Sequence, residues 1–251
     1  MNVTDINRVQ KAISKTADDR PRNLLAQALI LLGFVSLIFA AVPELDLIVT
    51  RLFWEPTAGF EFNENSFLIA FRDANRFLPW IVTGTAVALL IPSPFLRYLK
   101  YPPEPHKLLF VIIFFAAGPG LGVHLIKILV GRARPRALEE FGGDAFFTPP
   151  WQLTDECVRN CSFISGEAAS AFALLTLVVF VAPRYRTLYL GAVGIVAAAF
   201  AFNRVMLGAH FLSDVVIAWN LMFVLAALLW QSFSRNSPQI DAIFARDFDQ
   251  P

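Results

Sequence analysis

Three polar residues near the end of the chain have types and spacing that suit nucleophilic chemistry. Arg204, His210 and Asp214 lie within an otherwise apolar run, and polar side chains at membrane depth usually have a partner or a task. If Asp214 lies in the first turn of a helix, its carboxylate can reach a ring nitrogen of His210. That contact would fix the tautomer and strengthen the other nitrogen as a base or nucleophile. The alternative is an Arg–Asp pair that ties helix ends together, with His210 as an interfacial residue.

A basic motif covers residues 127–135, with Lys127 near the end of an apolar run and Arg134 just beyond it. Snorkelling toward the headgroups explains one such side chain. It explains less well a lysine followed by three arginines. The flanking Arg132 and Arg136 could hold a second phosphate, or could equally be solvated loop charges.

A third motif covers residues 162–168 and opens another apolar run. Ser165 is a suitable N-cap, and the free N–H groups of a helix start form a ready anion site. Gly166 permits close approach of backbone to a ligand, and Glu167 is favoured by the helix dipole. Taken alone, an ordinary N-cap explains this motif as well.

The composition predicts the elements that position these motifs. Of 251 residues, 56% are hydrophobic and 16% charged, and the mean hydropathy is +0.56. Several apolar runs approach the roughly 20 residues that cross a bilayer as a helix. We therefore expect an all-α, polytopic membrane bundle of one domain, residues 24–232, between an N-terminal segment 1–23 and a tail 233–251. The six expected spans are 24–42, 77–96, 108–130, 166–182, 188–207 and 211–230.

The remaining segments carry further expectations. Residues 44–77 suit a loop or short helices at the membrane interface. No cleavable signal peptide is apparent, and a net charge of +1 gives no argument for nucleic acid. Basic residues in the N-terminal segment, in residues 97–107 and 183–187, and in the tail place both termini in the cytoplasm.

With that orientation, the three motifs meet at the outer membrane–water boundary. Together they supply three cations, helix N–H groups, a His–Asp pair and a carboxylic acid, which describes a phosphate site because guanidinium forks match phosphate oxygens. Cys157 and Cys161 lie in the outer loop. A small disulfide is plausible on an oxidising face, and we discount half of a metal site because no further Cys or His lies nearby in the loop.

The combined pattern resembles the three-part signature of the type 2 phosphatidic acid phosphatase superfamily, in its membrane branch. It reads Lys127-x6-Arg134-Pro135, then Ser165-Gly166, then Arg204-x5-His210-x3-Asp214. The resemblance implies that His210 attacks phosphorus to form a phosphohistidine and that Asp214 orients it. It also implies no metal or other cofactor. The phosphoryl group would be held by Lys127, Arg134, Arg204, Ser165 and Gly166.

Two positions depart from the family pattern. Asn203 replaces a serine, which is a mild change, whereas Glu167 replaces the histidine that serves the family as general acid. Glu167 could take that role if an apolar surround raised its pKa, although three nearby cations oppose this. Either Glu167 is a tuned acid, or the leaving group needs little help, or the enzyme is impaired.

The Ser-Gly-Glu-Ala variant is similar to that of bacterial lipid A 4′-phosphatases. This likeness favours lipid A as the substrate, at the periplasmic face of a bacterial inner membrane. Undecaprenyl diphosphate, phosphatidylglycerol phosphate and phosphatidic acid are alternatives, as are a lipid phosphotransferase and a non-catalytic lipid-binding relative. Vanadate-dependent haloperoxidases share the motif but are soluble. Apart from the lipid and the bilayer, no obligate partner is evident.

Overall fold

The computed structural model describes residues 23–96, 99 and 102–245, and the regular elements in these residues are helices. Most of the expected N-terminal segment, residues 1–22, and the end of the tail, residues 246–251, lie outside the described residues. The expectation of an all-α fold is confirmed for the part of the chain that is described.

Six helical rods overlap the six expected spans. Four of them are long and apolar enough to cross a membrane: Asn23–Ala41, a rod that begins at Pro105, α8 (Arg186–Met206) and α9 (Leu212–Arg235). The others are α3 (Ser66–Leu90) and the shorter Gly166–Phe180, which combines α7 (Gly166–Ala173) with a 3-10 turn, Leu174–Phe180. The chain is a multi-pass membrane protein, whereas the number of six spans and the orientation stay predictions.

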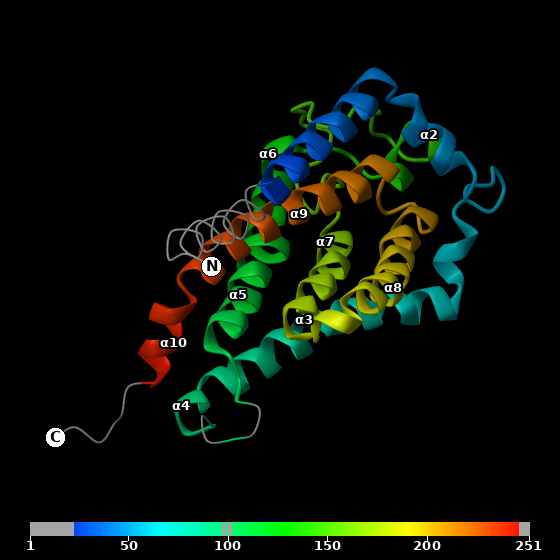
Figure 1. The fold of residues 1–251 in the computed structure, drawn as a ribbon. Coiled ribbons are helices and arrows are strands. Elements are labelled where there is room, and N and C mark those ends of the chain that lie inside the picture. The colour runs from blue at the N-terminus through cyan, green and yellow to red at the C-terminus, as the bar shows by residue number, and fades with distance from the viewer. Residues whose placement is uncertain (1–22, 97–98, 100–101, 246–251) are drawn as a thin grey trace.

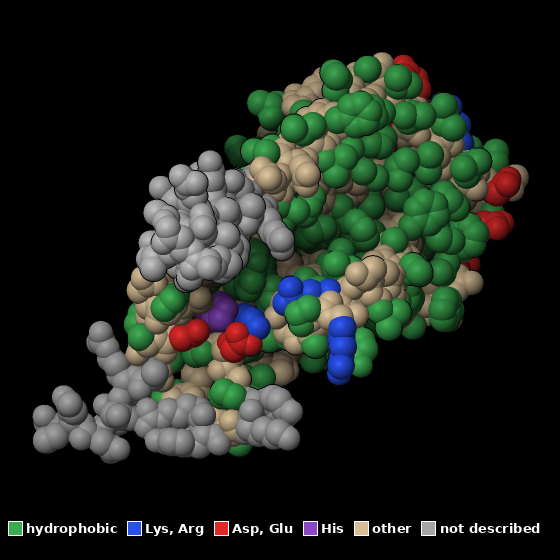
Figure 2. All heavy atoms as spheres, in the orientation of Figure 1, with side chains coloured by type: hydrophobic (Ala, Val, Ile, Leu, Met, Phe, Trp, Pro, Cys, Tyr) green, Lys and Arg blue, Asp and Glu red, His purple; other side chains and the backbone are tan. Residues whose placement is uncertain are grey.

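The outer surface of the bundle suits a lipid environment. Large hydrophobic side chains lie exposed on several rods, and Trp80 and Ile195 keep 79% and 75% of their surface. Figure 2 shows a broad hydrophobic face, with charged side chains gathered toward its two ends. A soluble domain rarely exposes apolar surface on this scale, so these side chains most simply face lipid.

Helix α7 lies in the middle of the bundle and packs against α3, α8 and α9 (Figure 1). Four of its eight residues are alanines with no exposed surface: Ala168, Ala169, Ala171 and Ala173. Small side chains let helix backbones approach closely in a membrane protein. The start of α7 is therefore held rigidly among three other helices.

The third rod consists of α5 (Pro105–Phe115), a π-helical segment, Ala116–Gly122, and α6 (Val123–Val130). It ends at Gly131, which has a φ of 68° and would place a Cβ atom 2.0 Å from the carbonyl oxygen of Thr154. Only glycine fits this left-handed position. The turn directs residues 132–134 back over the end of the bundle.

Two parts of the chain differ from expectation. The segment expected as a loop or short helices at the interface contains one short helix, α2 (Glu44–Arg51), but also the start of α3, which begins at Ser66, eleven residues before the expected span. The tail contains the end of α9 and a further helix, α10 (Ser237–Ala245). Asp241 of α10 accepts a hydrogen bond from the backbone N–H of His106 and contacts its ring at 2.8 Å, which fastens α10 to the start of α5.

Candidate active site

His210 lies in the short connection between α8 and α9 and has no exposed surface. Gly208 makes the turn possible, with a φ of 57° and the Phe60 ring against it. Two carboxylates flank the imidazole: Asp214 Oδ2 is 3.6 Å from Nδ1, and Glu167 Oε2 is 3.6 Å from Nε2. Both distances are longer than a hydrogen bond. Burial and the charge of Lys127 lower the pKa of His210 below its ordinary value of 6.5, which favours the neutral ring.

A closed ionic cluster lies on the Nδ1 side of the ring. Arg132 Nη1 donates to Asp214 at 2.7 Å, and its Nη2 donates to Asp46 of α2 at 2.8 Å. Asp214 also accepts hydrogen bonds from Ser162 Oγ and from the N–H of Phe211. Arg132, Asp46 and Asp214 are completely buried. Their charges therefore stabilise one another with little screening by water.

This cluster corrects the interpretation of Arg132 as a solvated loop charge or a ligand of a second phosphate. Its Nε also donates to Thr148 O at 2.8 Å, and its guanidinium lies 4.1 Å from the centre of the Phe211 ring. Arg132 is thus a structural residue. Asp46 was missed, although an aspartate within the apolar sequence Leu45-Asp46-Leu47-Ile48 could have indicated a buried partner.

An open set of charges lies on the Nε2 side. Glu167, the second residue of α7, contacts Arg204 Nη2 of α8 at 3.4 Å. Arg204 is 3% exposed, yet its Nε and Nη1 have no hydrogen-bond partner among the described residues. Buried guanidinium donors without partners are costly. The unpaired donors of Arg204 therefore indicate an anion-binding site beside the imidazole of His210.

The first half of α3 supplies two residues that sequence reasoning missed. Arg76 Nη2 lies 2.9 Å from Glu167 Oε1, and Asn75 Nδ2 donates to the backbone oxygen of Glu167 at 2.9 Å. A signal was present, because charged residues stand directly before the expected second span. Glu167 is therefore held between Arg76 on one side and Arg204 on the other.

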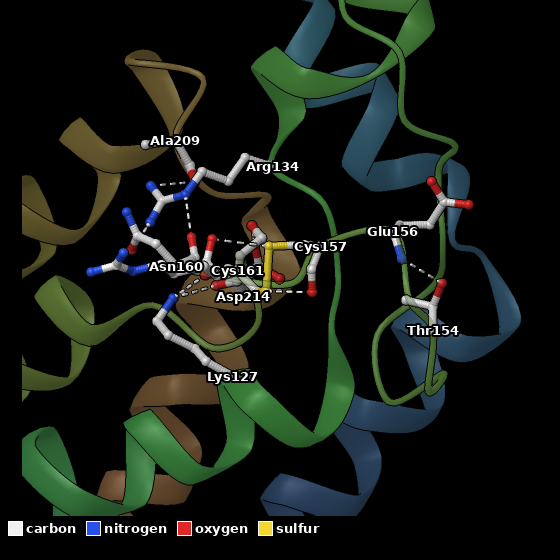
Figure 3. The surroundings of a disulfide bond; sticks show 11 residues. Lys127, Arg134, Thr154, Glu156, Cys157, Asn160, Cys161, Ala209 and Asp214 are labelled. Atoms are coloured by element: carbon white, nitrogen blue, oxygen red, sulfur yellow. Dashed lines mark hydrogen bonds between the residues drawn. A yellow bond between two sulfur atoms is a disulfide. The ribbon is translucent and has the colours of Figure 1, made fainter.

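Lys127 and Arg134 come from the end of α6 and the loop behind it. Lys127 Nζ donates to the backbone oxygens of Cys161 and Ser162, the latter at 3.0 Å. Arg134 donates to Asn160 through Nε and Nη2, at 2.9 and 2.7 Å, and Figure 3 shows both cations beside this loop. Cys157 and Cys161 form a disulfide that closes the loop. Arg134 still has N–H groups free for a ligand because it has five donors.

Ser165 and Gly166 begin α7 within the same site. Ser165 is the N-cap, and its Oγ accepts from the N–H of Ala168 at 3.2 Å. Its own N–H donates to the backbone oxygen of Asp214, which joins the start of α7 to α9. The Gly166 amide finds no acceptor in the described parts of the chain. Its N–H adds a backbone donor to a site whose other donors are cationic.

The structure thus brings the eight residues singled out from the sequence to one end of the bundle. On the Nδ1 side of His210, the candidate nucleophile, the carboxylate of Asp214 is held in place by hydrogen bonds. On the Nε2 side lie cations that still have hydrogen-bond donors without a partner among the described residues. Such an arrangement can hold a phosphoryl group against Nε2 of His210.

The sequence model of the PAP2 superfamily matches residues 106–238, and the chain belongs to this superfamily. The chain is 30% identical over 208 residues to a lipid A 4′-phosphatase of Francisella tularensis subsp. novicida, covering 80% of this chain and 93% of that one. It is 32% identical over 207 residues to a lipid A 4′-phosphatase of Rhizobium leguminosarum, covering 76% and 89%.

A solved structure shares the fold. The transmembrane PAP2-type phosphatidylglycerolphosphate phosphatase of Bacillus subtilis has a TM-score of 0.56 and 18% identity, covering 84% of this chain and 96% of that one. The resemblance inferred from the three motifs is confirmed. The chain is a membrane phosphatase of the PAP2 superfamily.

Proposed function

We propose that this phosphatase removes the 4′-phosphate of lipid A at the periplasmic face of the inner membrane, through a phosphohistidine at His210. One observation carries the chemistry. The Nε2 atom has no hydrogen-bond partner among the described residues, and it faces a cluster that includes unpaired donors of Arg204. The named relatives support the substrate.

The reaction would proceed in two balanced steps. The Nε2 lone pair of neutral His210 forms a bond to phosphorus as the bond from phosphorus to the sugar oxygen breaks, and Glu167 protonates that oxygen. Water then attacks phosphorus, the N–P bond breaks, and Glu167 takes the proton from water. Lys127, Arg134 and Arg204 stabilise the charge on the phosphoryl oxygens in both transition states.

The proton on Glu167 can come with the substrate. In the ligand-free site Arg76 and Arg204 stabilise the carboxylate of Glu167. A phosphate monoester has its second pKa at about 6, so a share of the substrate arrives with a proton. When Arg204 turns to the phosphate, Glu167 loses one cation and gains an anionic neighbour. Both changes favour its protonation.

An apolar groove beside Glu167 suits the lipid chains. Its volume is about 560 Å³, and it lies between α3, the π-helical segment and the start of α7. Trp80, Ile112 and Phe115 are among its lining residues, and Arg76 and Glu167 line it as well. Hydrocarbon can therefore lie in the groove while the phosphate reaches His210.

Two features support a periplasmic position for the active site: the basic residues at the opposite end of the bundle, and the disulfide. Lys107 and Arg184 lie near the starts of α5 and α8, at the end of the bundle opposite His210. Basic loops favour the cytoplasmic side, and a disulfide such as Cys157–Cys161 is typical of an oxidising compartment.

A second candidate is a lipid diphosphate phosphatase. The pairing of Glu167 with Arg76 and Arg204 favours it, because a phosphate leaving group needs less protonation than a sugar alkoxide. Undecaprenyl diphosphate is the representative substrate of this class.

Phosphate release by the purified protein in detergent tests the proposal, with lipid A, undecaprenyl diphosphate and phosphatidic acid compared side by side. We expect release from lipid A, with mass spectrometry locating the loss at the 4′ position. His210→Ala should abolish both release and an acid-labile phosphoprotein. His124→Ala is the matched control, because His124 is exposed. Preference for the diphosphate would favour the second candidate, and release that survives His210→Ala would contradict the mechanism.

A further inference from the structure

A second, smaller pocket lies beside Arg134 and shares no lining residue with the apolar groove beside Glu167. Its volume is about 270 Å³, and its lining comes from two loops, residues 133–137 and 156–160. The mechanism above uses only one lining side chain, Arg134. The others face a space that no step of the reaction occupies.

The pocket is rich in positive charge. Arg134, Arg136 and Arg159 line it, against one carboxylate, Glu156. Glu156 accepts a hydrogen bond from the N–H of Phe146 at 2.8 Å. Arg136 and Arg159 form no ion pair with any residue that the structure describes. Guanidinium groups that converge without a carboxylate partner favour an oxyanion.

The backbone that carries these arginines is fixed to the active site. The N–H of Arg136 donates to Gly208 O at 3.1 Å, two residues before His210. Arg159 precedes Asn160, which accepts two hydrogen bonds from Arg134, and the Cys157–Cys161 disulfide closes that loop (Figure 3). Arg134 Nη1 also donates to Ala209 O at 3.3 Å. The pocket and the phosphate site thus share one guanidinium on a preorganised frame.

We propose that this pocket is a second anion subsite, which binds another phosphate or carboxylate on the headgroup whose scissile phosphate faces His210. The inference rests on the proposed function, since it assumes a lipid phosphate at the first site. It narrows the substrate class to headgroups with at least two oxyanions. Arg136 and Arg159 act on binding and specificity, whereas Arg134 serves both subsites.

Titration calorimetry with inorganic phosphate and pyrophosphate tests the subsite without reference to the lipid. Pyrophosphate spans two oxyanion positions, so we expect it to bind the wild type at least about tenfold more tightly than phosphate. In the Arg136→Gln/Arg159→Gln double variant the two affinities should become similar. Lysine at both positions should restore part of the difference. Arg51→Gln, an exposed arginine paired with Glu140, is the matched control and should leave the ratio unchanged.

A kinetic arm distinguishes a headgroup from free phosphate. The double variant should raise KM for a lipid diphosphate, whose two phosphates are as close together as those of pyrophosphate, about tenfold. It should leave KM for the corresponding lipid monophosphate nearly unchanged and preserve kcat for both. An unchanged pyrophosphate ratio, or equal KM changes for both lipids, would overturn the subsite. Weaker phosphate binding with unchanged lipid kinetics would assign the pocket to free phosphate and overturn the headgroup assignment. Failure of the wild type to hydrolyse lipid A would instead refute the proposed function, while the calorimetric result would still decide the pocket.

Discussion

The buried charges on the two sides of the His210 ring differ in whether their hydrogen-bonding groups are all paired. Behind Nδ1, the charges of Asp46, Arg132 and Asp214 are fully buried and hydrogen-bonded to one another. In front of Nε2, Arg204 is almost as deeply buried, but its Nε and Nη1 have no partner within the described part of the chain. The first group is complete without a ligand. The second is not.

We therefore expect the charges on the Nδ1 side to contribute to folding stability and those on the Nε2 side to contribute to phosphate binding. A buried ion pair loses several kcal/mol when one partner is removed, because the remaining charge stays desolvated. A buried cation without a full set of partners costs stability in the ligand-free protein and is compensated when an anion arrives. Substitutions on the two sides should therefore have different signatures.

The largest effect on folding is expected from Arg132→Met. It leaves Asp46 and Asp214 buried and unpaired, which costs about 3–5 kcal/mol. The unfolding temperature in detergent should fall by roughly 10 °C or more, and activity should fall with it. The control is Arg51→Met, because the exposed Arg51–Glu140 pair contributes only about 0–1 kcal/mol. Equal stability of the two variants would contradict a structural role for Arg132.

Arg204→Met should give the opposite signature. Loss of a cation that stabilises phosphoryl charge should lower phosphate release about 10²–10³-fold. The unfolding temperature should hold or rise, because Glu167 keeps Arg76 as a partner and two unsatisfied donors disappear. Single-turnover rates and thermal unfolding of the same preparation measure both quantities. A large drop in unfolding temperature would show that Arg204 belongs to the structural side.

Glu167→Gln separates acid catalysis from electrostatic positioning. If Glu167 protonates the leaving oxygen, the rate on lipid A should fall about 10²-fold or more. The rate on p-nitrophenyl phosphate should change little, since that leaving group needs no proton. The two substrates serve as mutual controls within one variant. An equal loss on both would assign Glu167 to positioning Arg76 and Arg204 rather than to proton transfer.

The candidate site residues were easier to single out from the sequence than the residues that support them. Lys127, Ser165 and His210 were proposed as site residues because each lies in a short motif whose residue types and spacing indicate a chemistry without a structure. The ion pair of Asp46 with Arg132 was not predicted, because Asp46 lies in α2 and Arg132 in the loop behind α6, and the two residues meet only in the folded chain. Local sequence gives Arg132 the appearance of a loop charge, and only burial reveals its role.

The rods were predicted by apolar composition, but their ends were not. α3 begins at Ser66, where Asn65 Oδ1 accepts from the N–H of Leu68. Charged residues in its first turns broke the apolar run that marked the expected span. For this reason Arg76, which contacts Glu167, was assigned to a segment of loop or short interfacial helices.

The smallest expected effect is on the pH dependence of activity, which reports the charges around the His210 ring. Its pKa is lowered by burial and by Lys127, against the opposing carboxylates Asp214 and Glu167. The nucleophile must be neutral, so a lowered pKa keeps it active as the pH falls below 6.5, the ordinary value. The acid limb of kcat/KM for phosphate release should therefore lie below pH 6.5. Lys127→Met should move this limb upward, because a positive charge near the ring is lost. Arg134 also lowers the pKa, so Arg134→Met should shift the limb in the same direction but less. A limb that is unmoved in both variants would mean that the titration belongs to another group, with Glu167 the first to examine.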